Sequence, residues 1–126
     1  MAPAEVRQYE IQARSTETFG RVLASARNHH FVVDGPLQNG CPGEAITPAE
    51  VFLAGVAACG VELMQVIARE RQLPLHGASV EICGVLERGN PVRPDVTLFN
   101  SVRLQFHLKG ITAEQGALLI AAFKAR

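Results

Sequence analysis

The chain has 126 residues, 48% of them hydrophobic and 19% charged, which is typical of one compact globular domain. Twelve basic residues balance twelve acidic ones, so no net charge favours nucleic acid or an anionic membrane as a partner. Three cysteines without a CxxC pair and four scattered histidines indicate neither a disulfide framework nor a metal site. We therefore expect no metal and no cofactor.

The N-terminal part of the sequence predicts strands followed by a loop. Residues 6–14 alternate loosely, residues 18–27 can form a second strand, and residues 31–33 are a short β-branched run closed by Asp34-Gly35-Pro36. Gly, Pro and Asn crowd residues 37–46, which predicts a loop rather than a linker between domains. The first residues lack the basic-then-apolar order of a secretion signal, so we expect a cytoplasmic protein.

The clearest element is a helix over residues 47–71. Thr47 is a good N-cap, Pro48 suits the first helical position, and Glu50 completes a capping box. The run 51–61 has no polar stripe, yet it is shorter than the roughly 20 residues that span a bilayer. Such a helix needs cover on all sides, by a sheet or by a second subunit, which favours an intimate homodimer that does not enter a membrane.

The C-terminal part predicts a hairpin and a second helix. Residues 78–86 and 96–108 both alternate between apolar and polar side chains, and the turn-rich segment between them favours their pairing. A second capping box, Thr112 with Gln115, begins a helix over residues 112–126.

The stretch TPAEVFLAGVAACG, residues 47–60, resembles the "NPEQLFAAGYAACF"-type helix of the OsmC/Ohr family. The spacing from Pro48 to Cys59 is intact, and the order of strands and helices extends the likeness weakly over nearly the whole chain. The resemblance implies an α+β fold in which curved antiparallel sheets wrap around a long central helix in an intertwined homodimer. Residues 1–126 would be one OsmC-like domain that lacks the C-terminal part of the family pattern.

The resemblance also implies a chemistry for Cys59. In the family's peroxidases the helix cysteine attacks an organic hydroperoxide, becomes a sulfenic acid, and condenses with a second cysteine, as part of an oxidative stress response. A free thiol has a pKa of about 8.5 and is mostly protonated at neutral pH. An arginine and a glutamate therefore hold the thiolate in these enzymes, and an outside dithiol is the expected reductant.

Arg21 and Glu50 are the candidates for these two partners of the thiolate. Arg21 resembles the arginine of a family Gly-Arg pair, and we favour it over Arg14 and Arg27. Glu50 stands one place after the family position, which Ala49 occupies here, and is turned by about 100° around the helix. Glu50 is thus either a catalytic residue or only a cap.

Two functions stay open from the sequence. The first is a peroxidase that reduces organic hydroperoxides through Cys59; the second is a non-catalytic dimer that binds a small apolar ligand around a structural Cys59. The sequence reaches Arg126 roughly where the family's second cysteine would follow, so either the polypeptide continues or the mechanism differs. Cys41 is a candidate substitute thiol or an idle loop residue, and His29-His30 either line the site or are solvated.

Overall fold

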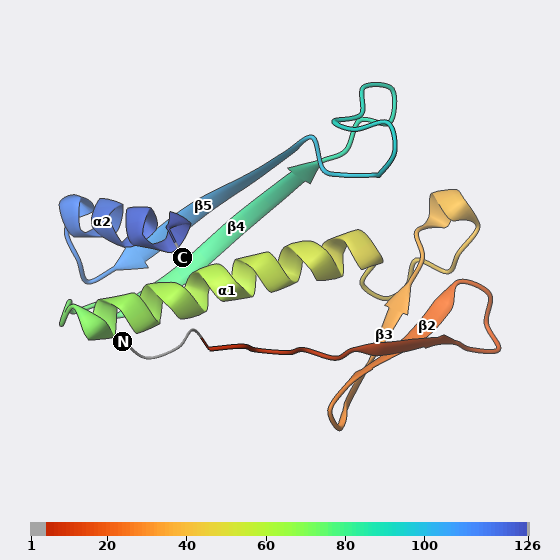
Figure 1. Cartoon of the computed structure of the whole chain (residues 1–126), viewed down its shortest axis with the longest axis horizontal. Coiled ribbons are helices and arrows are strands. Elements are labelled where there is room, and N and C mark those ends of the chain that lie inside the picture. Colours follow the sequence, from red (N-terminus) through yellow and green to blue (C-terminus); the bar gives the residue numbers. More distant parts are fainter. Residues whose placement is uncertain (1–4, 126) are drawn as a thin grey trace. The chain divides into compact units, whose positions relative to one another are not determined.

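Figure 1 shows the computed structural model, which describes residues 5–125. It is an α+β chain, as predicted, with antiparallel sheets and one long helix. The elements in chain order are β1 (Gln12–Ser15), β2 (Arg21–Ala26), β3 (His29–Asp34), the 3-10 turn η1 (Leu37–Asn39), α1 (Pro48–Glu70), β4 (Gly77–Val85), β5 (Ser101–Lys109) and α2 (Ala113–Lys124). The chain divides into two compact units, Met1–Val51 and Phe52–Arg126.

The first unit is built on an antiparallel sheet in the order β1-β2-β3. Its buried hydrophobic side chains are Ala24 on β2 and Val33 on β3. The predicted strand over residues 6–14 is too long, because only Gln12–Ser15 is paired. Gln12 lies opposite Ser25, almost at the end of β2, so no strand remains for residues 6–11 to pair with.

The second unit contains the predicted hairpin, in which β4 pairs antiparallel with β5. Burial alternates along both strands, and the less exposed face includes the paired residues Val80 and Phe106. The second strand begins at Ser101 rather than at residue 96. The backbone N–H of Asn100 donates to the carbonyl of Val85, where β4 ends, so residues 96–100 have no partner strand.

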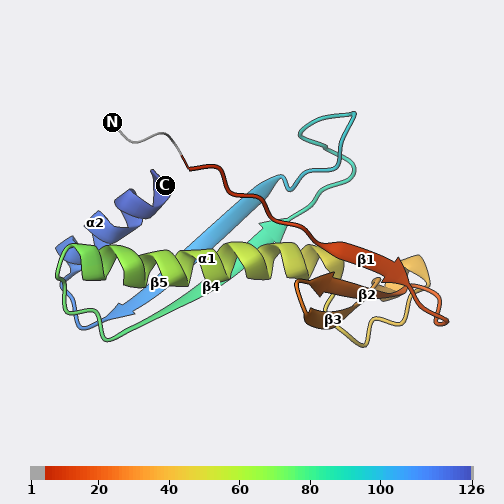
Figure 2. The same cartoon turned by 60° about the horizontal axis from the view of Figure 1, so that its bottom comes forward.

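The core of the second unit lies where the C-terminal half of α1 meets α2 and the hairpin (Figure 2). Met64 and Leu119 are fully buried there, with Ile67 and Ala68 beside them. Gly60 lets the ring of Phe106 approach the helix, since a Cβ at that position would lie 3.3 Å from the ring. The predicted capping box of α2 is present, and it fixes where this helix begins.

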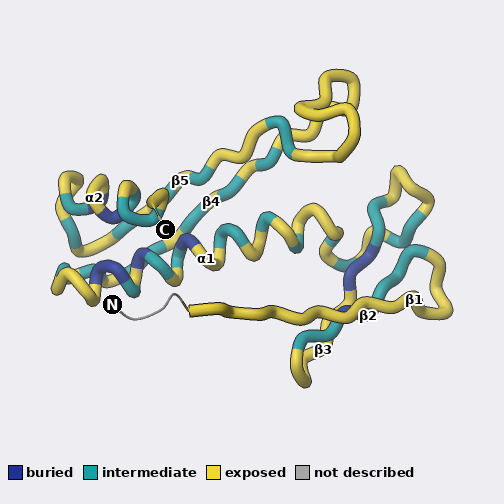
Figure 3. The backbone as a smooth tube through the Cα atoms, in the orientation of Figure 1, coloured by how far each residue is buried: buried dark blue, intermediate teal, exposed yellow. Residues whose placement is uncertain are grey.

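The N-terminal half of α1 is only partly covered (Figure 3). Side chains of an exposed apolar face include Phe52, Ala54, Ala58 and Cys59, and Gly55 lies among them. A single chain thus leaves one side of this helix uncovered, and cover of that side by a second subunit stays a prediction. By length and composition α1 could also cross a membrane, a test that core helices of soluble proteins pass as well.

Truncation of Leu119 tests the core of the second unit. Leu119→Ala removes a fully buried side chain, so we expect the free energy of unfolding to fall by about 2–5 kcal/mol. Leu118→Ala is the matched control, because Leu118 is 51% exposed and its loss should cost less than about 1 kcal/mol. Urea unfolding of both variants measures the difference, and equal losses would contradict the assigned core.

Candidate functional site

Glu50 acts as the cap of α1. Its Oε1 accepts hydrogen bonds from the backbone N–H of Thr47 at 3.0 Å and from the Thr47 hydroxyl at 2.7 Å. The hydrogen bond from the Thr47 backbone N–H is the main cause of a lowered pKa of Glu50, and the hydrogen bond from the Thr47 hydroxyl lowers this pKa further. The predicted reach of Glu50 back to the cap is confirmed, although the Thr47 hydroxyl donates to the carboxylate instead of accepting from the helix backbone.

Arg21 forms a two-pronged ion pair with Asp34. Its Nε lies 2.8 Å from Oδ1 and its Nη2 lies 2.8 Å from Oδ2. The two residues face each other across the β2–β3 pair, as the first residue of one strand and the last of the other. Asp34 is completely buried, whereas the Arg21 side chain is 30% exposed. Nη2 also lies 3.4 Å from the exposed carboxylate of Glu44.

Asp34 forms hydrogen bonds with the backbone of the loop that leads to α1. Its Oδ2 accepts the backbone N–H groups of Glu44 at 3.0 Å and Ala45 at 2.9 Å, and its own N–H donates to the carbonyl of Ile46. The hydrogen bond from Arg21, aided by the two backbone bonds, holds the pKa of Asp34 well below its usual range. The same pair raises the pKa of Arg21.

Sequence reasoning missed this role of Asp34 and used the residue only as part of a turn signal. A carboxylate that ends one predicted strand, with an arginine near the start of the neighbouring strand, was the available signal. What the sequence does not contain is the register that brings the two residues opposite each other.

Cys41 packs against two glycines beside the ion pair. A Cβ on Gly20 would lie 2.5 Å from the Cys41 sulfur, and one on Gly35 would be closer still. The N–H of Gly35 donates to the carbonyl of Gly20 at 2.8 Å, so the two glycines are joined directly. Cys41 is thus partly buried and has a packing role, instead of being an idle exposed loop residue.

Cys59 lies exposed on α1, in the second unit, while Arg21 and Glu50 belong to the first. Glu50 precedes Cys59 by nine positions on the same helix. Nine residues of α-helix amount to a rise of about 13 Å and a rotation of about 900°, which places the two side chains on opposite faces. Glu50 therefore cannot contact the Cys59 of its own helix.

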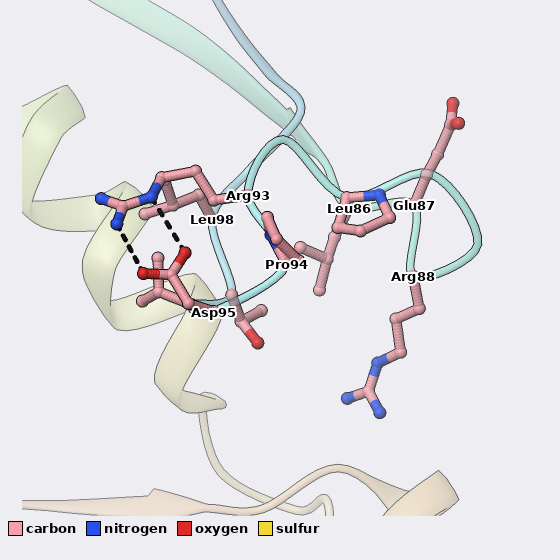
Figure 4. A pocket seen from close by; sticks show the side chains of 10 residues that line it. Leu86, Glu87, Arg88, Arg93, Pro94, Asp95 and Leu98 are labelled. Atoms are coloured by element: carbon pink, nitrogen blue, oxygen red, sulfur yellow. Dashed lines mark hydrogen bonds and ion pairs between the residues drawn. The ribbon is translucent and has the colours of Figure 1, made fainter.

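The remaining candidates do not form a chemical site. His29 and His30 are both exposed, and His30 Nδ1 lies 2.7 Å from the Ser25 hydroxyl. Within residues 5–125 no group of three His, Cys, Asp or Glu side chains could hold a metal ion. A hollow of about 590 Å³ lies in the loop between β4 and β5, where Arg93 is paired with Asp95 (Figure 4). Its lining includes no cysteine, so it is not a thiol site.

Solved structures show what fold this is. An OsmC-like protein from Mycoplasma pneumoniae matches with a TM-score of 0.80 at 16% identity, covering 95% of this chain and 82% of that one. The chain has the OsmC/Ohr fold. An organic hydroperoxide resistance protein from Legionella pneumophila matches at 0.70 and 22% identity, over 95% and 84% of the two chains.

A third OsmC/Ohr-fold structure, from Vibrio cholerae, holds captopril in one of its active sites. It matches with a TM-score of 0.63 at 22% identity, over 95% of this chain and 79% of that one. No family model and no curated protein matches the sequence. At these identities the likeness establishes the fold and not the activity.

Acid should weaken the contribution of Asp34 to stability. The unfolded-state pKa of an aspartate is about 3.9, and the folded-state pKa of Asp34 is lower, so its stabilisation is complete above about pH 5 and declines as the pH falls further. We expect Asp34→Asn to unfold more easily than the wild type at pH 7, with a difference that shrinks between pH 4 and pH 2. Urea unfolding across this range measures it, with Glu44→Gln as control; a difference independent of pH would contradict the ion pair.

Proposed function

We propose that the protein is a homodimeric, thiol-dependent peroxidase that reduces organic hydroperoxides through Cys59. The observation that carries this proposal is the position of Cys59, exposed on the apolar face of α1 in a chain with the OsmC/Ohr fold. Phe52 lies on the same helix and is 59% exposed. Such surroundings suit a peroxide with an apolar tail better than hydrogen peroxide.

The reaction balances with one thiol and an outside reductant. The thiolate sulfur of Cys59 attacks one peroxide oxygen, the O–O bond breaks, and the alkoxide takes a proton and leaves as an alcohol. Cys59 is then a sulfenic acid. A dithiol such as dithiothreitol attacks that sulfur, releases water, and forms a mixed disulfide; its second thiol restores the Cys59 thiol and leaves as the cyclic disulfide.

The helical geometry supports a second copy of the chain as part of the site. Glu50 faces away from the Cys59 of its own helix, and one side of α1 is left uncovered by its own chain. The first unit buries only two hydrophobic side chains among its described residues, which is little for a unit that stands alone. We infer an intertwined dimer in which Arg21 and Glu50 of one subunit serve the Cys59 thiolate of the other.

We place the protein in the cytoplasm, with no nucleic-acid or membrane partner, an organic hydroperoxide as substrate and an external dithiol as reductant. The second candidate is a dimer that binds a small apolar ligand without turnover. It is favoured by the bonds of Arg21 to Asp34 and of Glu50 to Thr47, which give both charged residues a structural task in their own chain.

The peroxidase proposal is tested by turnover. We expect the full chain with dithiothreitol to consume cumene hydroperoxide faster than hydrogen peroxide, and Cys59→Ser to lower the rate to the level of the free reductant. Cys83→Ser is the matched control, because Cys83 is also an exposed thiol and lies on β4. Wild-type turnover no faster than that of Cys59→Ser would favour the ligand-binding dimer.

The shared site is tested by mixing two defective variants. Glu50→Gln retains the capping geometry but loses the charge, and Cys59→Ser loses the nucleophile. If Glu50 acts across the dimer, unfolding the two variants together and refolding them should restore about a quarter of wild-type activity above the parents, since half the dimers then carry one intact site. An unrestored mixture would contradict the site, and full activity of Glu50→Gln alone would make Glu50 only a cap.

A further inference from the structure

We propose that Asp34 is a positioning residue that fixes the guanidinium of Arg21 in the orientation needed at a Cys59 thiolate. This inference rests on the proposed function. It adds Asp34, which lies outside both the sequence motif of residues 47–60 and helix α1. Asp34 itself is buried and cannot touch a substrate. It acts through Arg21 alone.

The hydrogen bonds leave one edge of the guanidinium available. Asp34 binds Nε and Nη2, and among the residues that the structure describes Nη1 has no hydrogen-bond partner. A planar guanidinium held at two nitrogens can neither rotate nor tilt freely. The direction in which Nη1 points is therefore fixed. The Arg21 side chain that carries it is partly exposed.

The carboxylate that holds Arg21 is itself immobilised. Two backbone N–H groups of the loop, from Glu44 and Ala45, bind the same Oδ2 that receives Nη2. Gly35, the next residue, is joined to Gly20, which precedes Arg21, and Cys41 packs against both glycines. The orientation of Arg21 is thus set by backbone on both sides of the ion pair.

Charge alone predicts the opposite effect from positioning. Asp34 and Glu44 together outnumber the single positive charge of Arg21, so removing either carboxylate would make the region more positive. If Asp34 only neutralised charge, Asp34→Asn would favour the thiolate. If Asp34 positions Arg21, the same substitution releases the guanidinium and disfavours the thiolate, because a disordered cation stabilises a neighbouring anion less.

The test is the pH profile of alkylation of Cys59 by iodoacetamide in the full chain, read by peptide mass mapping. Cys83, an exposed thiol on β4, is the internal control in every sample. Glu44→Gln is the matched variant, since it removes the exposed carboxylate 3.4 Å from Arg21 and leaves the two-pronged bond intact. Arg21→Lys keeps the charge and removes the fork, and it replaces Asp34→Asn if that variant does not fold.

We expect Asp34→Asn and Arg21→Lys each to move the midpoint of Cys59 alkylation up by about one pH unit, which makes the reaction roughly tenfold slower at pH values below both midpoints, with no such rise in Glu44→Gln or at Cys83. A Cys59 alkylation midpoint that stays the same or falls in folded Asp34→Asn would overturn the inference. So would a midpoint that rises in Arg21→Lys but not in Asp34→Asn. Peroxide turnover is measured separately: a shifted midpoint without wild-type turnover supports the positioning role and refutes the peroxidase.

Discussion

The buried ion pair between Arg21 and Asp34 is the interaction on which the first unit depends. Burying a carboxylate is costly unless charge and hydrogen bonds replace the lost water, and here a guanidinium fork and two backbone N–H groups do so. Among the described residues of this unit Ala24 and Val33 are the only buried hydrophobic side chains, so apolar packing alone would specify it poorly. The ion pair joins the ends of β2 and β3, and Asp34 also binds the loop residues Glu44, Ala45 and Ile46 just before α1.

The long helix α1 begins in this unit, continues into the second unit and carries Cys59. Its C-terminal half packs against α2 and the hairpin, around the buried Met64 and Leu119. Its N-terminal half presents small and apolar residues, with Cys59 among them, on a face that the chain leaves open. Exposure makes the thiol accessible, but a thiol in water is mostly protonated at neutral pH. In the proposed dimer the second copy would supply both the cover and the charges that the thiolate needs.

Local signals in the sequence were enough for the elements and their caps. The reach of Glu50 back to Thr47, the capping box of Thr112 and the alternation in β4 and β5 depend on neighbours in the chain, and the structure has them as predicted. The errors concern where pairing stops, since residues 6–11 and 96–100 have strand-like patterns but no partner strand. The role of Asp34 depends on a register between strands and on loop amides ten residues away, which no periodicity encodes.

Arg21 and Glu50 can each hold a structural bond in their own chain and still act at the thiolate. Each uses part of its charged group within its own chain: Arg21 binds Asp34 through Nε and Nη2, and Glu50 binds Thr47 through Oε1. In the part of the chain that the structure describes, Arg21 Nη1 and Glu50 Oε2 have no hydrogen-bond partner. A structural bond on one side therefore does not exclude a role at the thiolate on the other. It lowers the entropy that each side chain would lose on meeting a sulfur brought by the second subunit, because both are already ordered.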